Sequence, residues 1–190
     1  LRGTGYKTAQ QCLQVALSQK EPFLLIGGHM SVGTVALYRG ELNLAQTHFE
    51  QGFALYDPQQ SSVLISLYGY DPGVFCQREL AWVKWLKGYP QQALDLIDAA
   101  LALARTLTHP FNLAGALGLA AFIHHLRGDV RACQEKAQET IAYSTEHGAV
   151  LWRLIGSMLQ GWVLTEDGDL EGGIEQIRQG LNGYRATGVR

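Results

Sequence analysis

The stretch His125-Leu126-Arg127-Gly128-Asp129-Val130, followed by the small residue Cys133, decides the fold because variants of it occur four times in the chain. The other copies surround Gly40, Gly88 and Gly168, each after an apolar helix-like segment. The four glycines are separated by 48, 40 and 40 residues. Self-similarity at such a period indicates a repeat protein in which each repeat is one supersecondary unit.

The repeated stretch has the composition of a turn between two helices. A glycine after an apolar helix can adopt the left-handed conformation that ends it, and a polar residue or proline then starts the next helix. Small residues stand seven positions before and five positions after each turn glycine. They are Gly33, Ala81, Ala121 and Gly161 before the turn, and Ala45, Ala93, Cys133 and Gly173 after it. Small residues on both sides of a short turn predict a closely packed helical hairpin.

The segments between the turns have helical periodicity. Ala93, Ile97, Ala100 and Ala104 recur at the spacing of one helix face, and no segment alternates with the period of two that strands require. The sequence therefore predicts an all-α protein of antiparallel helix pairs with about nine helices. We expect helices at roughly 7–19, 22–39, 43–56, 73–87, 90–107, 111–127, 130–147, 150–167 and 170–186.

The repeats divide the chain into consecutive segments. We expect one domain over residues 1–190, made of a half repeat at 1–20 and repeats at 21–72, 73–110, 111–148 and 149–190. The half repeat and the first residue, Leu1, suggest a piece of a longer protein. The first interval is eight residues longer than the others, and the extra length is expected to form a loop of about 15 residues at 57–73. Such an insertion either takes part in binding or is a packed connector.

Composition narrows the class of protein. Apolar residues make up 47% of the 190 residues and charged residues 17%, so the chain can bury a continuous core and disorder is not expected. The net charge of −2 indicates neither a nucleic-acid partner nor a basic membrane-binding patch. No stretch reaches the about 20 apolar residues of a membrane span. Three widely spaced cysteines argue against a disulfide framework and favour a cytoplasmic location.

Several stretches resemble one group of repeat proteins. The turn pattern is similar to the tetratricopeptide (TPR) consensus, although 40 residues exceed the usual about 34. The closer likeness is to the TPR-like arrays of large bacterial signalling ATPases, such as maltose-activator-type transcriptional regulators and ATPases fused to cyclase or kinase domains. It is carried by Tyr38-Arg39-Gly40-Glu41-Leu42, Ala54-Leu55-Tyr56-Asp57-Pro58, Tyr70-Asp71-Pro72-Gly73-Val74 and Tyr184-Arg185-Ala186-Thr187-Gly188. The resemblance implies a right-handed α-α superhelix that senses a partner or effector while catalysis occurs in other domains.

Motifs for catalysis, cofactors and metals fit the sequence poorly. Gly3-Thr4-Gly5-Tyr6-Lys7-Thr8 departs from a phosphate-binding loop because Tyr6 separates the glycine from the lysine, and we interpret it as a loop that leads into a helix. The adjacent His124 and His125 point about 100° apart on a helix, and no H-E-x-x-H or G-x-S-x-G pattern occurs. We therefore expect no catalytic residue, no cofactor and no metal ligand.

A binding groove is expected along the first helix of each pair, where solenoids present their concave surface. Trp82, Phe122 and Trp162 recur every 40 residues, which favours packing between repeats over ligand binding. Residues that break the period are better candidates. They are Arg78, Trp85 and His125, with Met30 and Met158 nearby in register. A cation, an indole and an imidazole suit a peptide with a carboxylate, or an aromatic ligand.

Three functions remain open from the sequence. The first is a non-catalytic module that binds a protein or peptide partner, or a small-molecule effector, within a bacterial signalling or transcription-regulatory protein. The second is a structural spacer or oligomerisation segment, because the ends of an open array expose apolar surface and allow self-association. The third is an enzyme with an all-helical site, which requires paired titratable groups in a closed pocket.

Overall fold

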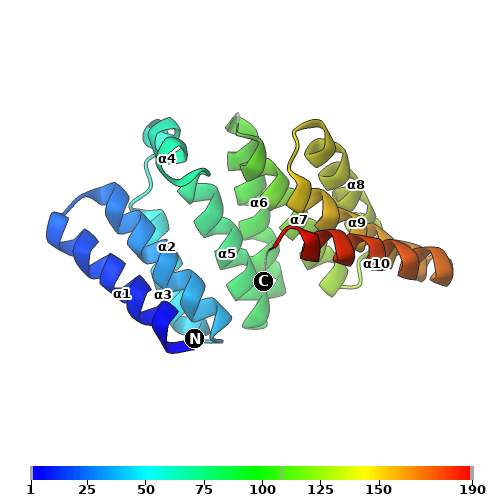
Figure 1. The fold of residues 1–190 in the computed structure, drawn as a ribbon, viewed down its shortest axis with the longest axis horizontal. Helices are drawn as coiled ribbons and strands as arrows, with labels where there is room; N and C mark the ends of the chain where they lie inside the picture. The colour runs from blue at the N-terminus through cyan, green and yellow to red at the C-terminus, as the bar shows by residue number, and fades with distance from the viewer. Residues whose placement is uncertain (1, 108, 189–190) are drawn as a thin grey trace. The chain divides into compact units, whose positions relative to one another are not determined.

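A computed structural model describes residues 2–107 and 109–188, and all their regular structure is helical (Figure 1). The prediction of an all-α protein is therefore confirmed. These residues form ten α-helices and one 3₁₀-helix, compared with the nine helices expected. The elements are α1 (Arg2–Gln19), α2 (Pro22–Tyr38), α3 (Leu42–Ala54), η1 (Pro58–Gln60), α4 (Ser61–Tyr68), α5 (Pro72–Leu86), α6 (Pro90–Thr106), α7 (Pro110–Leu126), α8 (Val130–Glu146), α9 (Val150–Glu166) and α10 (Leu170–Ala186).

The chain forms two compact units, Leu1–Leu107 and Thr108–Arg190. We call them the N-terminal unit, which holds α1 to α6, and the C-terminal unit, which holds α7 to α10. Within each unit, helices that follow one another form packed pairs, such as α2 with α3 and α9 with α10. First helices also contact each other, as α7 and α9 do. The antiparallel helix pairs expected from the repeat are thus present in both units.

The turn between α7 and α8 shows how the repeated stretch makes a hairpin. Gly128 has a φ of 70°, the left-handed conformation that glycine adopts without strain. This conformation lets the Asp129 N–H donate to the carbonyl of His124 at 3.0 Å, which closes the end of α7. The Asp129 side chain then accepts from the Ala132 N–H at 3.2 Å and caps α8. The other three predicted turn glycines also have positive φ values.

The small residues on either side of the turns allow the predicted close packing. A Cβ atom added to Gly161 of α9 would lie 2.8 Å from the carbonyl oxygen of Gly173 on α10. In the other three hairpins the positions equivalent to Gly173 are Ala45, Ala93 and Cys133, and all three are completely buried. In the α9–α10 hairpin the two backbones therefore meet without an intervening side chain, whereas the other three hairpins place a small buried side chain at this position.

The segment 57–73 differs from the predicted loop, because η1 and α4 occupy most of it. Asp71 holds the C-terminal end of this segment in place, because its buried carboxyl accepts from the Ser61 hydroxyl at 2.5 Å and from the Tyr56 hydroxyl at 3.0 Å. It also accepts from the Val74 N–H at 3.0 Å, which caps α5. In Figure 1, α4 lies at the end of the N-terminal unit opposite the N-terminus. The segment is a packed connector that also carries two tyrosines toward a pocket described below.

The helix α1 also differs from the prediction, since it begins at Arg2. Gly5, Tyr6 and Lys7 are therefore helical, and the interpretation of this stretch as a loop is wrong. No helix among the described residues is both long and apolar enough to cross a membrane.

The three cysteines are free thiols in different environments. Cys76 and Cys133 are buried, and burial raises their pKa to about 12 and about 11. Cys12 is exposed on α1.

Candidate ligand-binding pockets

The C-terminal unit holds a pocket of about 510 Å³ between α7, α9 and α10. Its walls are aromatic and aliphatic, and no charged residue lines it. The lining residues are Gly118, Leu119, Phe122, His125, Trp152, Ile155, Met158, Leu159, Trp162, Ile177 and Tyr184. We call this the C-terminal pocket.

Two glycines determine how the walls of this pocket are placed. Gly118 leaves α7 without a side chain where the indole of Trp152 lies, since an added Cβ would come 2.7 Å from Cε3 of that ring. Gly180 similarly leaves room on α10 for Met158, whose Cγ lies 2.5 Å from the position of an added Cβ. A large side chain from α9 therefore covers each neighbouring helix, and the pocket opens between them.

His125 lies within an aromatic cluster at this pocket. Its ring meets Trp162 edge to face with centroids 4.4 Å apart, and it stacks on Phe122 with centroids 5.9 Å apart. Burial lowers the pKa of His125, and its Nδ1 atom is buried without a hydrogen-bond partner. The imidazole is therefore neutral at pH 7 and contributes an aromatic wall rather than a positive charge.

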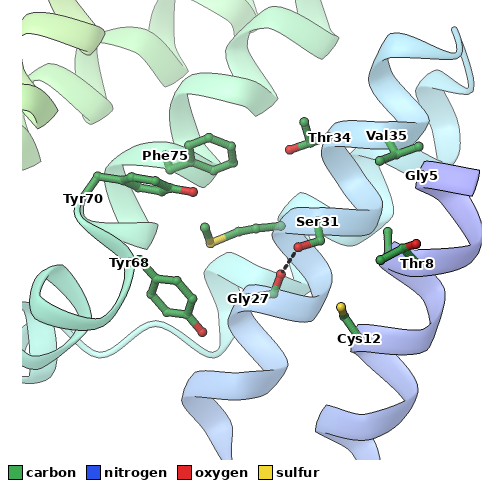
Figure 2. Close-up of a pocket in the computed structure, with 12 residues that line it drawn as sticks. Gly5, Thr8, Cys12, Gly27, Ser31, Thr34, Val35, Tyr68, Tyr70 and Phe75 are labelled. Carbon is green, nitrogen blue, oxygen red and sulfur yellow. Dashed lines mark hydrogen bonds between the residues drawn. The ribbon is translucent and has the colours of Figure 1, made fainter. Parts of the chain in front are cut away.

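The N-terminal unit holds a second pocket, of about 530 Å³, which Figure 2 shows. We call it the N-terminal pocket. α1 and α2 form one side, and the end of α4, the following loop and α5 form the other. The lining residues are Gly5, Thr8, Ala9, Cys12, Gly27, Met30, Ser31, Thr34, Val35, Tyr68, Tyr70 and Phe75.

Hydroxyl groups give the N-terminal pocket a different chemistry. The Ser31 hydroxyl donates to the carbonyl of Gly27 at 2.8 Å, and the Tyr68 hydroxyl donates to the carbonyl of Phe23. Burial raises the pKa of Tyr68 and of Tyr70, so both are neutral phenols at pH 7. The pocket can offer hydrogen bonds to a ligand but no charge from its lining residues.

Arg78 lies next to the N-terminal pocket. Its guanidinium lies over the Phe75 ring, 5.2 Å from the centroid, and near enough to Tyr70 to affect the pKa of that phenol. The guanidinium also pairs with Glu79 at 2.8 Å, and the two side chains are only 12% and 16% exposed. A carboxylate already balances the charge of Arg78, which weakens the case for Arg78 as an anion-binding group.

The predicted groove residues fall into two groups. Met30 and Arg78 lie in or beside the N-terminal pocket, and Trp85 is half-buried further along α5. His125 and Met158 both line the C-terminal pocket. A single groove that combines Arg78, Trp85 and His125 stays a prediction.

The periodic aromatic residues have two roles. Trp82 packs against the buried core of the N-terminal unit, and Phe122 and Trp162 pack against that of the C-terminal unit. Phe122 and Trp162 also line the C-terminal pocket. Packing within the repeat and lining a pocket are therefore compatible at Phe122 and Trp162.

Sequence reasoning missed Trp152 and Tyr184. Both break the 40-residue period, because the residues 40 positions earlier are Asn112 and Ser144. Their departure from the repeat is the sequence signal that marks both as candidate binding residues. Tyr68 and Tyr70 could not be placed in this way, because their position depends on the unexpected helix α4.

A histidine pair lies between α2 and α3. The Nδ1 atoms of His29 and His48 are 3.0 Å apart, and burial lowers the pKa of both side chains. One ring donates its N–H to the other in the neutral state. Within residues 2–107 and 109–188, no cluster of three or more histidine, cysteine, aspartate or glutamate side chains is placed to hold a metal ion.

Comparisons with known proteins identify the fold. No family model matches the chain, and no curated protein matches it. A solved structure of a Rap protein complexed with competence and sporulation factor is similar over 94% of this chain and 53% of its own, with a TM-score of 0.67 at 16% identity. This chain thus spans about half the length of that protein.

Two further solved structures are similar over nearly their whole length. One is a Podosopora anserina protein, a candidate kinesin light chain with nearly identical TPR-like repeats. The similarity covers 96% of this chain and 86% of that one, with a TM-score of 0.62 at 18% identity. The other is BtubC (BKLC) from P. vanneervenii, for which the similarity covers 100% of this chain and 93% of that one, with a TM-score of 0.57 at 12% identity. At such identities the likeness concerns the fold alone. The chain therefore has the all-α, TPR-like repeat fold that its sequence predicts.

Proposed function

We propose that this chain is a non-catalytic interaction module that binds a protein or peptide partner through an apolar group held in the C-terminal pocket. The observation that carries the proposal is the pocket itself, which combines about 510 Å³ of space with aromatic and aliphatic walls and an uncharged lining. Pockets of this size and composition suit a large side chain, and buried aromatic anchors dominate the energy of most interfaces. The lining holds no carboxylate or amine pair for acid–base chemistry, which supports binding over catalysis.

The comparison with the Rap protein gives the proposal independent support. That protein, which has the same fold, was solved in complex with competence and sporulation factor. The fold can therefore bind another molecule. By analogy we expect the present chain to hold its partner on the first helices of the pairs, which supply most of the pocket lining.

A pocket-filling variant tests this function. Peptides are first selected from a random display library against the chain, and their affinity is then measured for Leu119→Trp, which fills the C-terminal pocket. We expect a loss of about tenfold or more, since a filled pocket excludes the anchor. Val150→Ala, on α9 but outside the pocket, is the control and should bind as the original chain does. Equal affinity for both variants, with unchanged melting temperatures, would show that partners bind elsewhere.

The wider setting is also a proposal. The resemblance in the turn regions supports a bacterial signalling or transcription-regulatory protein that works in the cytoplasm, where the partner or effector signal would be passed to other domains. The free thiols of Cys12, Cys76 and Cys133 are compatible with a reducing compartment. The sequence of the complete gene product tests this proposal directly, since an ATPase, cyclase, kinase or DNA-binding domain in the same chain is expected.

A second candidate function is self-association through α10. Leu170, Ile174 and Leu181 lie on one helical face and are 61%, 46% and 37% exposed. An apolar stripe of this kind is a recognised interaction surface. Sedimentation at increasing concentration should show association that Ile174→Glu abolishes. A monomer at all concentrations would remove this candidate.

A further inference from the structure

The C-terminal pocket has an aromatic lining that contains no positively charged side chain. Its aromatic members are Phe122, Trp152, Trp162 and Tyr184, together with the neutral ring of His125. The face of an aromatic ring carries negative potential and attracts a cation within about 6 Å of the ring centroid. An anion would find no positive group among the lining residues, and its desolvation would be uncompensated. The walls therefore favour a cationic or neutral group.

Glu166 adds negative charge near this pocket. It is the last residue of α9, about one helical turn beyond Trp162, and residues four apart lie on the same face of a helix. It is also close enough to His125 for its carboxylate to oppose the lowering of the pKa of that imidazole. The carboxylate is exposed, so it can meet a charged group that enters beside Trp162.

The shortage of hydrogen-bond acceptors limits the kind of cation. The Tyr184 hydroxyl and one ring nitrogen of the neutral His125 are the acceptors among the lining side chains apart from weak sulfur. A primary ammonium has three N–H groups and a guanidinium has five, and most would lose their hydration without replacement. A methylated ammonium has few or no N–H groups and gives up little hydration on entering an aromatic pocket.

We infer that the C-terminal pocket binds a methylated or quaternary ammonium group, held by the faces of its aromatic residues and by the carboxylate of Glu166. This inference rests on the proposed function and specifies the chemistry of the group that enters the pocket. The group could belong to a small molecule or to a methylated lysine of a protein partner. The chemistry is the same, and the affinity for the two forms tells them apart.

Three small probes that share a hydroxyethyl group test the inference. Choline carries a quaternary ammonium, 3,3-dimethylbutan-1-ol is its neutral isostere, and ethanolamine carries an unmethylated ammonium. The chain has two methionines, and Met158 lies in the pocket, so its ¹³C-labelled methyl signal reports occupancy. We expect choline to bind at least about threefold more tightly than either of the other probes. A trimethyllysine peptide that binds much more tightly than choline would support a protein partner. Equal or weaker binding would favour a small-molecule source and contradict the protein partner of the proposed function.

Two variants separate the charge from the shape of the pocket. Glu166→Gln should weaken choline binding about threefold and leave 3,3-dimethylbutan-1-ol unaffected, because only the cation interacts with the carboxylate. Glu135→Gln, the same change on an exposed part of α8, which contributes no lining residue, should affect neither probe.

The outcomes distinguish this inference from the proposed function. If the neutral isostere binds as tightly as choline, or if Glu166→Gln leaves the preference for choline unchanged, the inference is overturned while the apolar pocket remains a binding site. If no probe moves the Met158 signal and peptides ignore Leu119→Trp, the inference and the proposed function both fail.

Discussion

Replacing Asp71 by alanine should destabilise the N-terminal unit much more than replacing the capping residue Asp57 in the same segment. The Asp71 carboxyl is completely buried and accepts hydrogen bonds from the Ser61 and Tyr56 hydroxyls and from the Val74 N–H. Loss of the helix cap costs about 1 kcal/mol. Each of the two hydroxyl hydrogen bonds contributes about 1 kcal/mol more, because its donor is left without this acceptor. The free energy of unfolding should therefore fall by about 3 kcal/mol.

The chain supplies a matched control for this experiment. Asp57 caps η1 by accepting from the Gln59 N–H at 3.0 Å, but this cap is exposed to solvent. Asp57→Ala should therefore cost less than about 1 kcal/mol. Urea unfolding followed by circular dichroism measures both values, and a loss of about 3 kcal/mol corresponds to a melting temperature lower by roughly 6–12 °C.

The same change should open the N-terminal pocket. Tyr68 and Tyr70 belong to the segment that Asp71 fixes, and both line that pocket. Hydrogen exchange in residues 57–73 should therefore accelerate in Asp71→Ala and stay slow in Asp57→Ala. Equal destabilisation by the two variants would refute the reasoning, because it would mean that the buried network contributes no more than an exposed cap.

Three other predictions concern packing, protonation and thiol reactivity. Gly161→Ala should lower the free energy of unfolding by about 1–3 kcal/mol in thermal denaturation, because the added Cβ would press on the α10 backbone. Gly5→Ala is the control: its Cβ would lie in open space, so this change should stabilise α1 by about 0.5–1 kcal/mol. The pKa values of His29 and His48 are lowered in the folded chain, so the unfolded chain binds more protons as the pH falls toward about 6.5 and below. The urea midpoint should therefore decrease when the pH is lowered from about 7.5 to about 5.5, and the decrease should be smaller in His48→Gln. A midpoint that does not depend on pH would contradict this prediction. A thiol reagent at about pH 8 should modify only Cys12 in the folded chain and all three cysteines after denaturation; modification of more than one thiol in the folded chain would contradict their burial.

The sequence predicted the helix pairs well because the signals that end and start them are local. The turn at Gly128 needs only a glycine, a capping aspartate and a small residue, and all three lie within six positions. The helix α4 was missed for the opposite reason. Its eight residues are too few for a periodic pattern to be recognised, and their stability comes from long-range contacts such as the bond between Ser61 and Asp71.

The candidate sites were only partly predictable. His125 and Met158 were identified because they break the repeat, and both line the C-terminal pocket. The indole of Trp152 packs against α7 only because Gly118 leaves space there. This contact joins two helices, so the sequence of either helix alone does not predict it. The period of a repeat therefore locates the helices, whereas the pockets depend on pairs of residues in different repeats.

The two methionines provide the most direct test of the central claim, because Met30 lines the N-terminal pocket and Met158 lines the C-terminal pocket. A chain labelled with ¹³C at the methionine methyl groups gives one signal for each pocket. On titration with a selected peptide, the account predicts a saturable shift of the Met158 signal that disappears in Leu119→Trp. Saturable peptide binding that leaves the Met158 signal unchanged would contradict the account.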